Sequence, residues 1–351
     1  MLEAEVLKAV QDHIPLVKEP FKVLADRLGS DEETVLYLLR SLKEKGIIRQ
    51  ISPIYDPKKA GYDSALVAFK VDKSRIEEVA KRVNSCPGVS HNYERYHEFN
   101  LWFTLAVPPD SLLTLEEVVE RLSRKDVKEK LILRSRKTFK IGVKLTFSSL
   151  YEREEPPGPS REPEPIRLTP LEKGIIKLTQ EDLPLDKRPF LPIAERLGLD
   201  EGILLEVLRG LREKGVIRRF SAILRHRKAG FRANCLVVWK VPEEKIDEVG
   251  RFLAGFKCVS HCYERTGWDY NLFTMVHGRS EEEVREFVHH ISRKANIDDF
   301  EVLFSGREFL KRRIKLFTED FYEWERRELG SPAHQGEDSE GSGKALLKEG
   351  F

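Results

Sequence analysis

The chain has 351 residues, enough for two or three ordinary domain cores, because single cores usually stop growing well before that length. Charged residues make up 34% and hydrophobic residues 40%, and no apolar run approaches the roughly 20 residues that a membrane-crossing helix needs. The 61 basic residues nearly balance the 59 acidic ones, so a net charge of +2 gives no bulk attraction to nucleic acid.

The first elements of the chain predict a winged helix-turn-helix over residues 1–55. Apolar spacing indicates three helices, and a glycine follows each of the last two. Asp31, or Ser30 before it, can cap the third helix. The next segment, IIRQISPIYD, alternates like a short β-wing. The predicted helices cover 2–10, 21–28 and 32–45.

Residues 56–150 predict a ferredoxin-like domain. Its elements follow the order βαββαβ, which is typical of an antiparallel sheet backed by two helices. The predicted strands cover 65–71, 91–96, 100–106 and 127–135, and the helices cover 74–84 and 115–124.

The chain then repeats itself, displaced by 169 to 171 residues. LLRSLKEKGIIRQ from Leu38 returns as VLRGLREKGVIRRF from Val207, and VSHNYER from Val89 returns as VSHCYER from Val259. Between the halves, the proline-rich residues 151–168 predict an extended tether that cannot form a packed core. The remaining predicted segments are a second winged helix (169–224), a second ferredoxin-like domain (225–328) and a disordered tail (329–351).

Functional residue types alternate along the predicted strand that begins near His91. His91, Tyr93, Arg95 and His97 would project from one strand face, beside the aromatic Trp102. A face built for a core would be apolar here, whereas the alternative is a solvated sheet surface. The second half keeps His261 but has Trp268 in the region of His97, and its His277 has no partner in the first half, so the sequence leaves open which half holds the working site.

The motifs around these residues are long and specific. IRQISPIYDPKKAGY with PGVSHNYERYHEFNLWFTL, and IRRFSAILRHRKAGFRANCLVVWKV with VSHCYERTGWDYNLFTMVHG, resemble the two subunit types of siroheme decarboxylase, here fused into one chain. The domain order resembles the Lrp/AsnC regulators over nearly all of both halves. This resemblance implies an α+β fold of two tandem copies, each a winged helix-turn-helix followed by a ferredoxin-like βαββαβ sandwich of the AsnC type, with the two halves pairing.

The resemblance also implies an activity. Siroheme decarboxylases remove CO2 from two acetate side chains of siroheme to give 12,18-didecarboxysiroheme, in alternative haem or haem d1 biosynthesis. Such a substrate is a large flat macrocycle with many carboxylates and a central iron, so it needs apolar walls and several cations. The candidate substrate-binding residues are Arg49, Arg95, Trp102, Arg136, Arg218, His261, Arg265, Trp268 and His277.

Decarboxylation leaves a carbanion-like centre that must receive a proton, and histidine suits that delivery at neutral pH. We assign His91 and His97 as the acid and positioning pair, with Tyr93 as a hydrogen-bond partner. Replacing either histidine with alanine should reduce turnover strongly. The macrocycle can delocalise the developing charge, so we expect no cofactor beyond the iron that the substrate carries.

Two regulator hypotheses remain: a winged-helix regulator that senses a tetrapyrrole, and one that senses a small effector. Binding to DNA is not favoured, because Asp31, Glu32 and Glu33 crowd the start of the predicted recognition helix and no Arg, Asn or Gln array there could read bases. Further dimerisation of the chain stays open.

No protein-bound metal site is expected. Cys258, His261 and Cys262 have no fourth ligand at a suitable spacing, and strand alternation points Cys262 away from His261. Four cysteines are too few for a disulfide framework, and the first residues read as an amphipathic helix and not as a signal peptide. We therefore expect reduced thiols and a cytoplasmic location.

Overall fold

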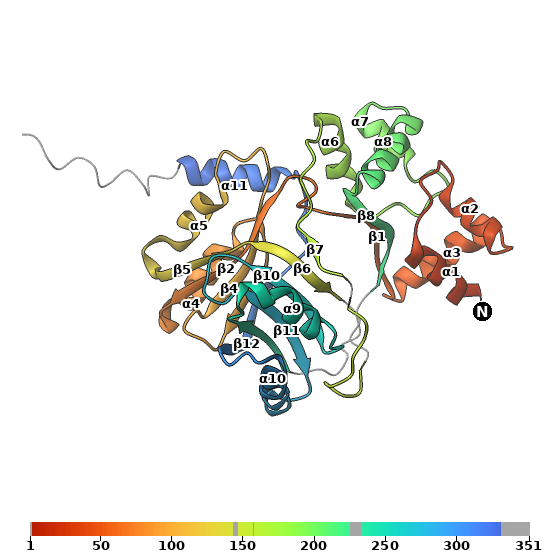
Figure 1. Cartoon of the computed structure of the whole chain (residues 1–351). Coiled ribbons are helices and arrows are strands. Elements are labelled where there is room, and N and C mark those ends of the chain that lie inside the picture. The colour runs from red at the N-terminus through yellow and green to blue at the C-terminus, as the bar shows by residue number, and fades with distance from the viewer. Residues whose placement is uncertain (1, 143–146, 157, 225–232, 331–351) are drawn as a thin grey trace, which may run out of the picture.

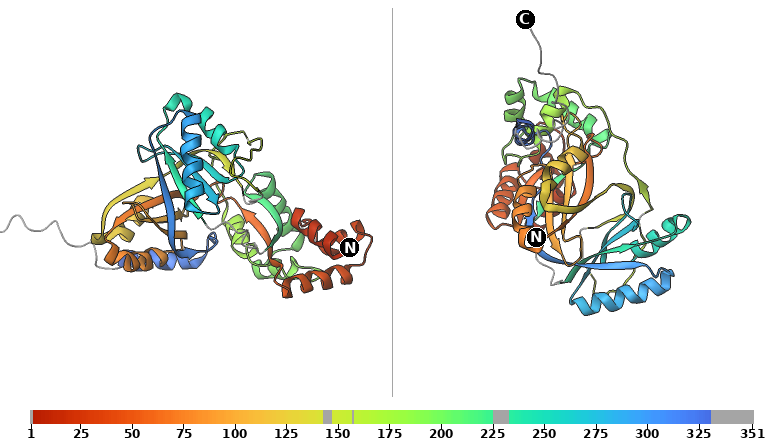
Figure 2. Two further views of the ribbon diagram at one scale, coloured as in Figure 1. Left: turned by 90° about the horizontal axis from the view of Figure 1, so that it is seen from below. Right: turned by 90° about the vertical axis from the view of Figure 1, so that its left-hand side faces the viewer.

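The computed structural model describes residues 2–142, 147–156, 158–224 and 233–330. Two lobes divide these residues: a winged-helix lobe, which contains α1–α3, α6–α8, β1 and β8, and a sheet lobe, which contains the other helices and strands (Figure 1). The left view of Figure 2 shows the two lobes side by side, with the amino terminus at the outer end of the winged-helix lobe.

Each half of the chain contributes three helices and one strand to the winged-helix lobe, as the sequence predicted. Asp31 caps α3, because its Oδ1 accepts the N–H of Thr34 at 2.9 Å. In the second half, Asp200 caps α8 by accepting the N–H of Gly202 at 2.7 Å. The elements are α1 (Leu2–Asp12), α2 (Pro20–Arg27), α3 (Glu32–Glu44), β1 (Ile48–Tyr55), α6 (Pro170–Thr179), α7 (Leu191–Leu197), α8 (Glu201–Glu213) and β8 (Ile217–Leu224).

The two wings pair with each other. β1 and β8 form an antiparallel two-stranded sheet that runs from the pair Ile48–Leu224 to the pair Tyr55–Ile217. The helices of both halves bury their apolar faces in one shared cluster, to which Leu39 and Leu208 contribute at 0% exposure. Burying two apolar faces against each other removes both from water, so the two winged helices form a single unit.

The sheet lobe holds two copies of the predicted βαββαβ order. The first copy consists of β2 (Asp63–Val71), α4 (Ile76–Asn84), β3 (Val89–Arg95), β4 (Leu101–Val107), α5 (Leu115–Ser123) and β5 (Val127–Leu133). The second copy consists of β9 (Ala233–Trp239), α9 (Ile246–Ala254), β10 (Val259–Arg265), β11 (Leu272–Gly278), α10 (Glu281–Ala295) and β12 (Phe300–Lys311).

The last strand of each half crosses to the sheet of the other half. β12 pairs with β9 through residues 300–304 and with β3 through residues 305–311. The first half continues past β5 into β6 (Ser135–Ile141), which pairs with β10, whereas the sequence predicted one strand over 127–135. The result is a ten-stranded sheet in the order β5-β2-β4-β3-β12-β9-β11-β10-β6-β7, in which β7 is the short strand Ser160–Arg161.

The inner faces of the two halves of this sheet enclose an apolar cluster. Trp102 and Leu133 of the first half meet Leu236, Phe273 and Leu303 of the second half there. The helices cover the outer faces, where each half has its own core. A residue on an inner face therefore lies between the two halves, which makes these faces the place where both repeats can contribute to one site.

The proline-rich segment and the last described helix are both packed against the rest of the chain. Residues 160 and 161 of the proline-rich segment form β7 (Ser160–Arg161), which pairs with β6, and Leu168 is 7% exposed in the core of the winged-helix lobe. The final helix, α11 (Glu319–Gly330), buries Phe321 and Trp324 in the core of the first half, although it follows the second. The predicted disordered tail lies outside the described residues from position 331 onward.

No helix among the described residues is long and apolar enough to span a bilayer.

Candidate active site

Strand β3 presents His91, Tyr93 and Arg95 on its inner face. Asn92, between them, is fully buried on the helix side, where its Nδ2 donates to Oδ1 of Asn84 at 2.9 Å. Since successive side chains on a strand alternate, the residues on either side of Asn92 point toward the other half of the sheet. The ring of His91 lies 6.3 Å from that of Tyr93 with an interplanar angle of 18°.

Strand β10 repeats the arrangement with His261, Tyr263 and Arg265. Here Cys262 is fully buried on the helix side, and the rings of His261 and Tyr263 lie 6.1 Å apart at 25°. The structure therefore contains two copies of one His-Tyr-Arg triplet, which we call the first and the second triplet.

His97 lies past the end of β3, so the prediction that it projects from that strand beside His91 was wrong, but its ring packs against Phe99 and Trp268 of the apolar cluster between the halves. β3 ends at Arg95, and His97 lies in the loop before β4. Its Nε2 contacts the carboxylate of Glu301, and its ring packs 5.9 Å from that of Trp268. The alternation of polar residues in the sequence continues past the point where the strand ends.

Trp102 is a core residue in this structure. Its side chain is 1% exposed, and its indole N–H donates to the carbonyl of Phe99 at 2.7 Å. Trp268 packs against it at 6.2 Å and is partly exposed. The expected role of Trp102 as an apolar wall for a ligand therefore does not fit its burial, whereas Trp268 keeps an accessible edge.

The arginine of each triplet, buried for Arg95 and partly buried for Arg265, has no counter-ion among the described residues. Arg95 is 7% exposed and donates to Oγ of Ser305 at 3.0 Å. Arg265 donates to the carbonyl of Leu133 at 3.1 Å, and its guanidinium lies 4.7 Å above the ring of Tyr263. The Nε atoms of both arginines are buried and have no hydrogen-bond partner.

Burial lowers the pKa of Arg95 to about 10 and also lowers the pKa of Arg265. A buried cation that lacks a carboxylate partner is costly, because it loses its hydration without a compensating charge. Each triplet therefore favours an anionic ligand.

The histidines of the triplets are held neutral. Burial, followed by the charge of Arg265 and then by His91, lowers the pKa of His261 to about 4. The pKa of His91 is lowered by burial and by Lys311, against the opposing effect of Glu308. His91 is thus among the groups whose charge opposes protonation of His261.

A third histidine joins the second triplet. Burial, and then His261, lower the pKa of His277 to about 4. Oγ of Ser260 lies 2.7 Å from Nε2 of His277 and 2.8 Å from Nδ1 of His261. The hydroxyl therefore joins the two imidazoles.

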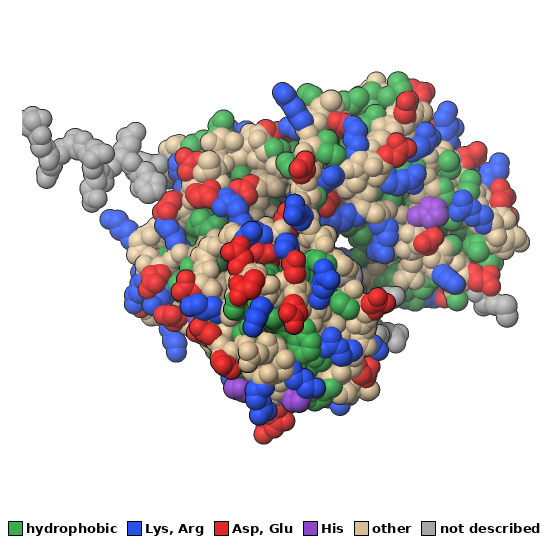
Figure 3. All heavy atoms as spheres, viewed as in Figure 1, with side chains coloured by type: hydrophobic (Ala, Val, Ile, Leu, Met, Phe, Trp, Pro, Cys, Tyr) green, Lys and Arg blue, Asp and Glu red, His purple; other side chains and the backbone are tan. Residues whose placement is uncertain are grey.

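A basic cleft of about 450 Å³ opens where the two lobes meet. Lys311, which lines it, pairs with His91 in the ladder between β12 and β3, so the cleft adjoins the first triplet. Figure 3 shows Lys and Arg side chains around the hollow between the lobes. The residues that line the cleft are Arg49, Gln50, Pro87, Gln180, Glu181, Ile223, Lys311, Arg312, Arg313, Ile314, Lys315 and Asp320.

Sequence reasoning found Arg49 but missed the other cations of the cleft. The signal was present as the run KRRIK over 311–315, at the end of β12. Two of these residues also hold the fold together, since Arg312 donates to the carbonyl of Cys86 at 2.6 Å and Arg313 donates to the carbonyl of Pro53 at 2.8 Å.

Arg136 and Arg218 already have carboxylate partners. Arg136 is exposed and pairs with Glu264 at 3.2 Å. Two nitrogens of Arg218 bind one oxygen of Asp56, at 2.9 and 3.0 Å, and Arg218 also acts on the pKa of Tyr263. The charges of both Arg136 and Arg218 are therefore already compensated by carboxylates of the chain.

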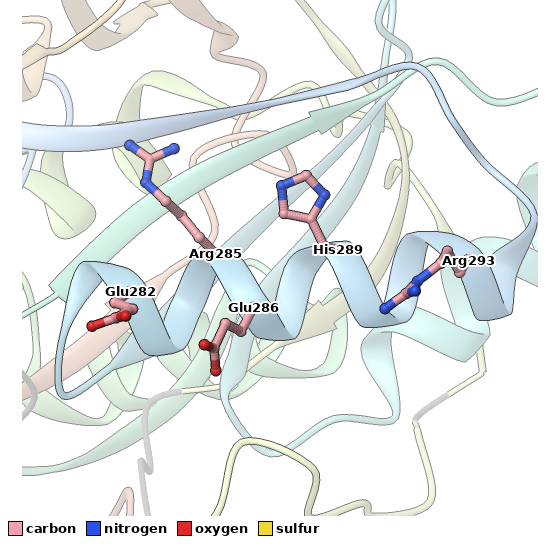
Figure 4. Close-up of a pocket in the computed structure, with 5 residues that line it drawn as sticks. All are labelled: Glu282, Arg285, Glu286, His289 and Arg293. Atoms are coloured by element: carbon pink, nitrogen blue, oxygen red, sulfur yellow. The ribbon is translucent and has the colours of Figure 1, made fainter.

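A separate hollow on the outer side of the second half lies along α10. Figure 4 shows Arg285 and His289 rising from the same side of the helix, and the guanidinium of Arg285 lies 4.6 Å from the ring of Phe304. The residues of this hollow are Glu282, Arg285, Glu286, His289 and Arg293. Alternating charges on one helix face are typical of a solvated surface, and the hollow lies on the opposite side of the sheet from the triplets.

Comparison with known proteins agrees with this arrangement. A family model described as an AsnC-like ligand-binding domain matches residues 59–140 and 228–310. A second model, described as a siroheme decarboxylase NirDL-like HTH domain, matches residues 3–49 and 172–218. Both models therefore match once in each half of the chain.

Known relatives match either most of the chain or about one half of it. A siroheme decarboxylase of Hydrogenobacter thermophilus is 52% identical over 327 residues, which cover 91% of this chain and 96% of the relative. A siroheme decarboxylase beta subunit of Methanosarcina barkeri is 41% identical over 145 residues, which cover 40% of this chain and 95% of the subunit.

A solved structure of the siroheme decarboxylase NirDL, in co-complex with an iron-uroporphyrin III analogue, superposes with a TM-score of 0.79 at 46% identity. The match covers 94% of this chain and 99% of that chain. Because the two domain models and a relative of 52% identity together span nearly all of it, the chain belongs to the siroheme decarboxylase family.

Proposed function

We propose that this chain decarboxylates siroheme, removing CO2 from two acetate side chains to give 12,18-didecarboxysiroheme for haem or haem d1 synthesis. Its family supports the reaction. The observation that carries the proposal is the pair of guanidiniums without counter-ions among the described residues, Arg95 and Arg265, whose Nε atoms are buried and unpaired and which share a strand face with His91 and His261 respectively. A macrocycle with many carboxylates supplies the negative charge that this surface lacks.

The basic cleft would hold the rim of the macrocycle. Arg49 and Lys311 offer cations to its carboxylates, and the adjoining first triplet receives an acetate arm. Placing an arm between an arginine and a histidine fixes the carboxyl carbon relative to the proton donor, which lowers the entropic part of the barrier.

His91 is the proton donor in this scheme. When the bond between the methylene carbon and the carboxylate carbon breaks, CO2 leaves and its bonding electrons remain on the arm. The carbon then takes one proton from the imidazolium, which turns the acetate arm into a methyl group. A bound polyanion offsets the charge of Lys311 and raises the pKa of His91, so the imidazole gains its proton as the substrate binds.

His261 takes the place that we had assigned to His97. It lies on the face of β10 that matches the face of His91 on β3, whereas His97 lies in a loop and contacts Glu301 of β12. Tyr93 donates to the carboxylate of Glu308 at 3.0 Å and stacks on His91, so it orients the imidazole. We propose no organic cofactor, because the conjugated ring of the substrate accepts the developing charge.

The test is an anaerobic incubation of the purified chain with siroheme, followed by mass analysis of the tetrapyrrole. The expected product has lost two molecules of CO2. A chain that binds the pigment and leaves its mass unchanged after many hours would refute the proposal.

A transcription regulator is the second candidate, but one arginine of each recognition helix is already engaged within the chain. Arg40 donates to the carbonyl of Leu185 at 2.8 Å, and Arg209 donates to the carbonyl of Leu16 at 3.2 Å. These contacts hold one winged helix against the other and compete with phosphate. Tight binding to a defined DNA site that weakens steeply with salt would favour the regulator.

We place the enzyme in the cytoplasm. All four cysteines are buried as free thiols, which suits a reducing compartment. The two triplets come from one chain, so a further homodimer is not needed to complete the site, and size-exclusion chromatography with light scattering would measure the oligomeric state.

A further inference from the structure

We infer that Asn234, His277 and Ser260 form a hydrogen-bonded chain that holds His261 as the Nδ1-protonated tautomer, so that its Nε2 acts as an electron-pair donor. The inference deepens the proposed function and rests on it for the role of His261, but the tautomer itself can be measured without substrate. Asn234, His277 and Ser260 are positioning residues, because they act through His261.

Three neighbouring strands supply the groups. Asn234 on β9 and His277 on β11 face each other in the antiparallel ladder, and Oδ1 of Asn234 lies 2.7 Å from Nδ1 of His277. Ser260 on β10 lies 2.7 Å from Nε2 of His277 and 2.8 Å from Nδ1 of His261. The backbone N–H of His277 also donates to the carbonyl of Cys258 at 3.0 Å, which fixes the register between β11 and β10.

The hydrogen atoms in this chain can be assigned one after another. An amide oxygen only accepts, so Nδ1 of His277 carries the hydrogen that it donates to Asn234. A neutral imidazole has one such hydrogen, so Nε2 of His277 accepts the hydroxyl hydrogen of Ser260. That hydroxyl has no second hydrogen to give, so its oxygen accepts the Nδ1 hydrogen of His261.

This leaves Nε2 of His261 with a lone pair and no hydrogen. Within the described residues, no hydrogen bond occupies that nitrogen, because the contact of His261 runs through Nδ1. Burial keeps the pKa of both His261 and His277 near 4, so each ring carries a single hydrogen at neutral pH. Such a nitrogen cannot donate to a carboxylate and instead accepts a hydrogen or binds an electron-poor centre.

The first half has no equivalent of this chain. Oγ of Ser90 lies 2.9 Å from Nδ1 of His91, but its other partner is the hydroxyl of Thr104, which can donate or accept. The ladder positions that correspond to Asn234 and His277 hold Ser64 and Ala106. The tautomer of His91 is therefore not fixed, and we assign proton delivery to His91 and electron-pair donation to His261.

The first experiment measures the tautomer directly. The full chain is labelled with ¹⁵N at histidine, and long-range ¹H–¹⁵N correlations are recorded at a pH of about 8, where the rings of His261 and His277 are neutral. The His261→Gln variant identifies the signals by their loss. The expected result is an unprotonated Nε2 and a protonated Nδ1 on His261, and the reverse pattern would overturn the inference.

Two substitutions of Asn234 test what fixes the tautomer. Asn234→Asp keeps an oxygen that accepts from His277, so the His261 signals and the turnover should stay within about threefold of wild type, whereas Asn234→Leu should mix the tautomers and reduce turnover by about tenfold or more. Ser64→Ala, at the matching place in the first half, is the control and should change neither.

The outcomes separate the two proposals. Unchanged His261 signals in Asn234→Leu would show that the amide does not orient the chain, and would refute the inference even if turnover fell. If His261 has the inferred tautomer but the protein releases no CO2 from siroheme, the proposed function is refuted and the inferred hydrogen-bond network stands.

Discussion

The neutrality of His277 predicts a specific loss of stability in acid. Its pKa in the folded chain is about 4, because it is buried beside His261, whereas an exposed imidazole has a pKa of about 6.5. The unfolded chain therefore takes up the proton first as the pH falls. The contribution of His277 to stability is complete above pH of about 6.5 and is lost as the pH falls toward about 4.

The size of the loss follows from the shift. Each pH unit between the two pKa values costs about 1.4 kcal/mol, so lowering the pH to about 4.5 removes about 2.5 kcal/mol for this one residue. The His277→Gln variant loses hydrogen bonds and should be less stable than wild type at neutral pH. It has no imidazole to protonate, so its deficit relative to wild type should shrink by about 2.5 kcal/mol between pH of about 7.5 and 4.5.

Urea unfolding followed by tryptophan fluorescence at several pH values measures these differences. The His13→Gln variant is the control for removing an exposed imidazole, because the side chain of His13 is 46% exposed. A deficit of His277→Gln that stays constant over this pH range, or an NMR titration of His277 with a midpoint near about 6.5, would show that the imidazole is not held neutral by the fold.

Three further predictions concern the active site. His91→Ala should reduce turnover by about 100-fold or more with an unchanged circular dichroism spectrum, as expected when a general acid is lost, and His97→Gln should stay within about threefold of wild type in the same assay. Lys311→Ala should raise the KM for siroheme by about tenfold and flatten its dependence on salt, and an unchanged KM would remove the basic cleft from the site. Arg95→Met should raise the free energy of unfolding by about 1 kcal/mol or more while turnover is lost, because it replaces a buried cation that has no counter-ion. A destabilised Arg95→Met variant in urea would show that the guanidinium is compensated in the free enzyme.

The spacing of apolar and polar residues along the sequence predicted much of the fold. The spacing of apolar residues marked α3 within one residue of its observed end, and Asp31 was among the two predicted caps. The strand alternation from His91 to Arg95 correctly placed three functional side chains on one face. These features depend on neighbours within a few residues, so the sequence alone records them.

The same rule explains where His97 was misplaced. Alternation shows which side of a strand a residue takes only as long as the strand lasts, and β3 ends two residues earlier. The length of β3 depends on how far its pairing with β4 and β12 extends, which the local pattern does not describe. The proline-rich segment, predicted as a free tether, likewise pairs with β6 because a distant strand offers it an edge.

The sequence by itself determined the duplication, the type of each helix and strand, the βαββαβ order, the inner face of β3 and the family motifs. Only the tertiary structure decided that β12 and β6 cross between the halves, that Lys311 lies beside His91, and that His277 reaches His261 through Ser260. The reason is physical: the unpaired N–H and C=O groups of a strand edge are the same for every partner, so the choice among distant strands depends on packing across the whole molecule.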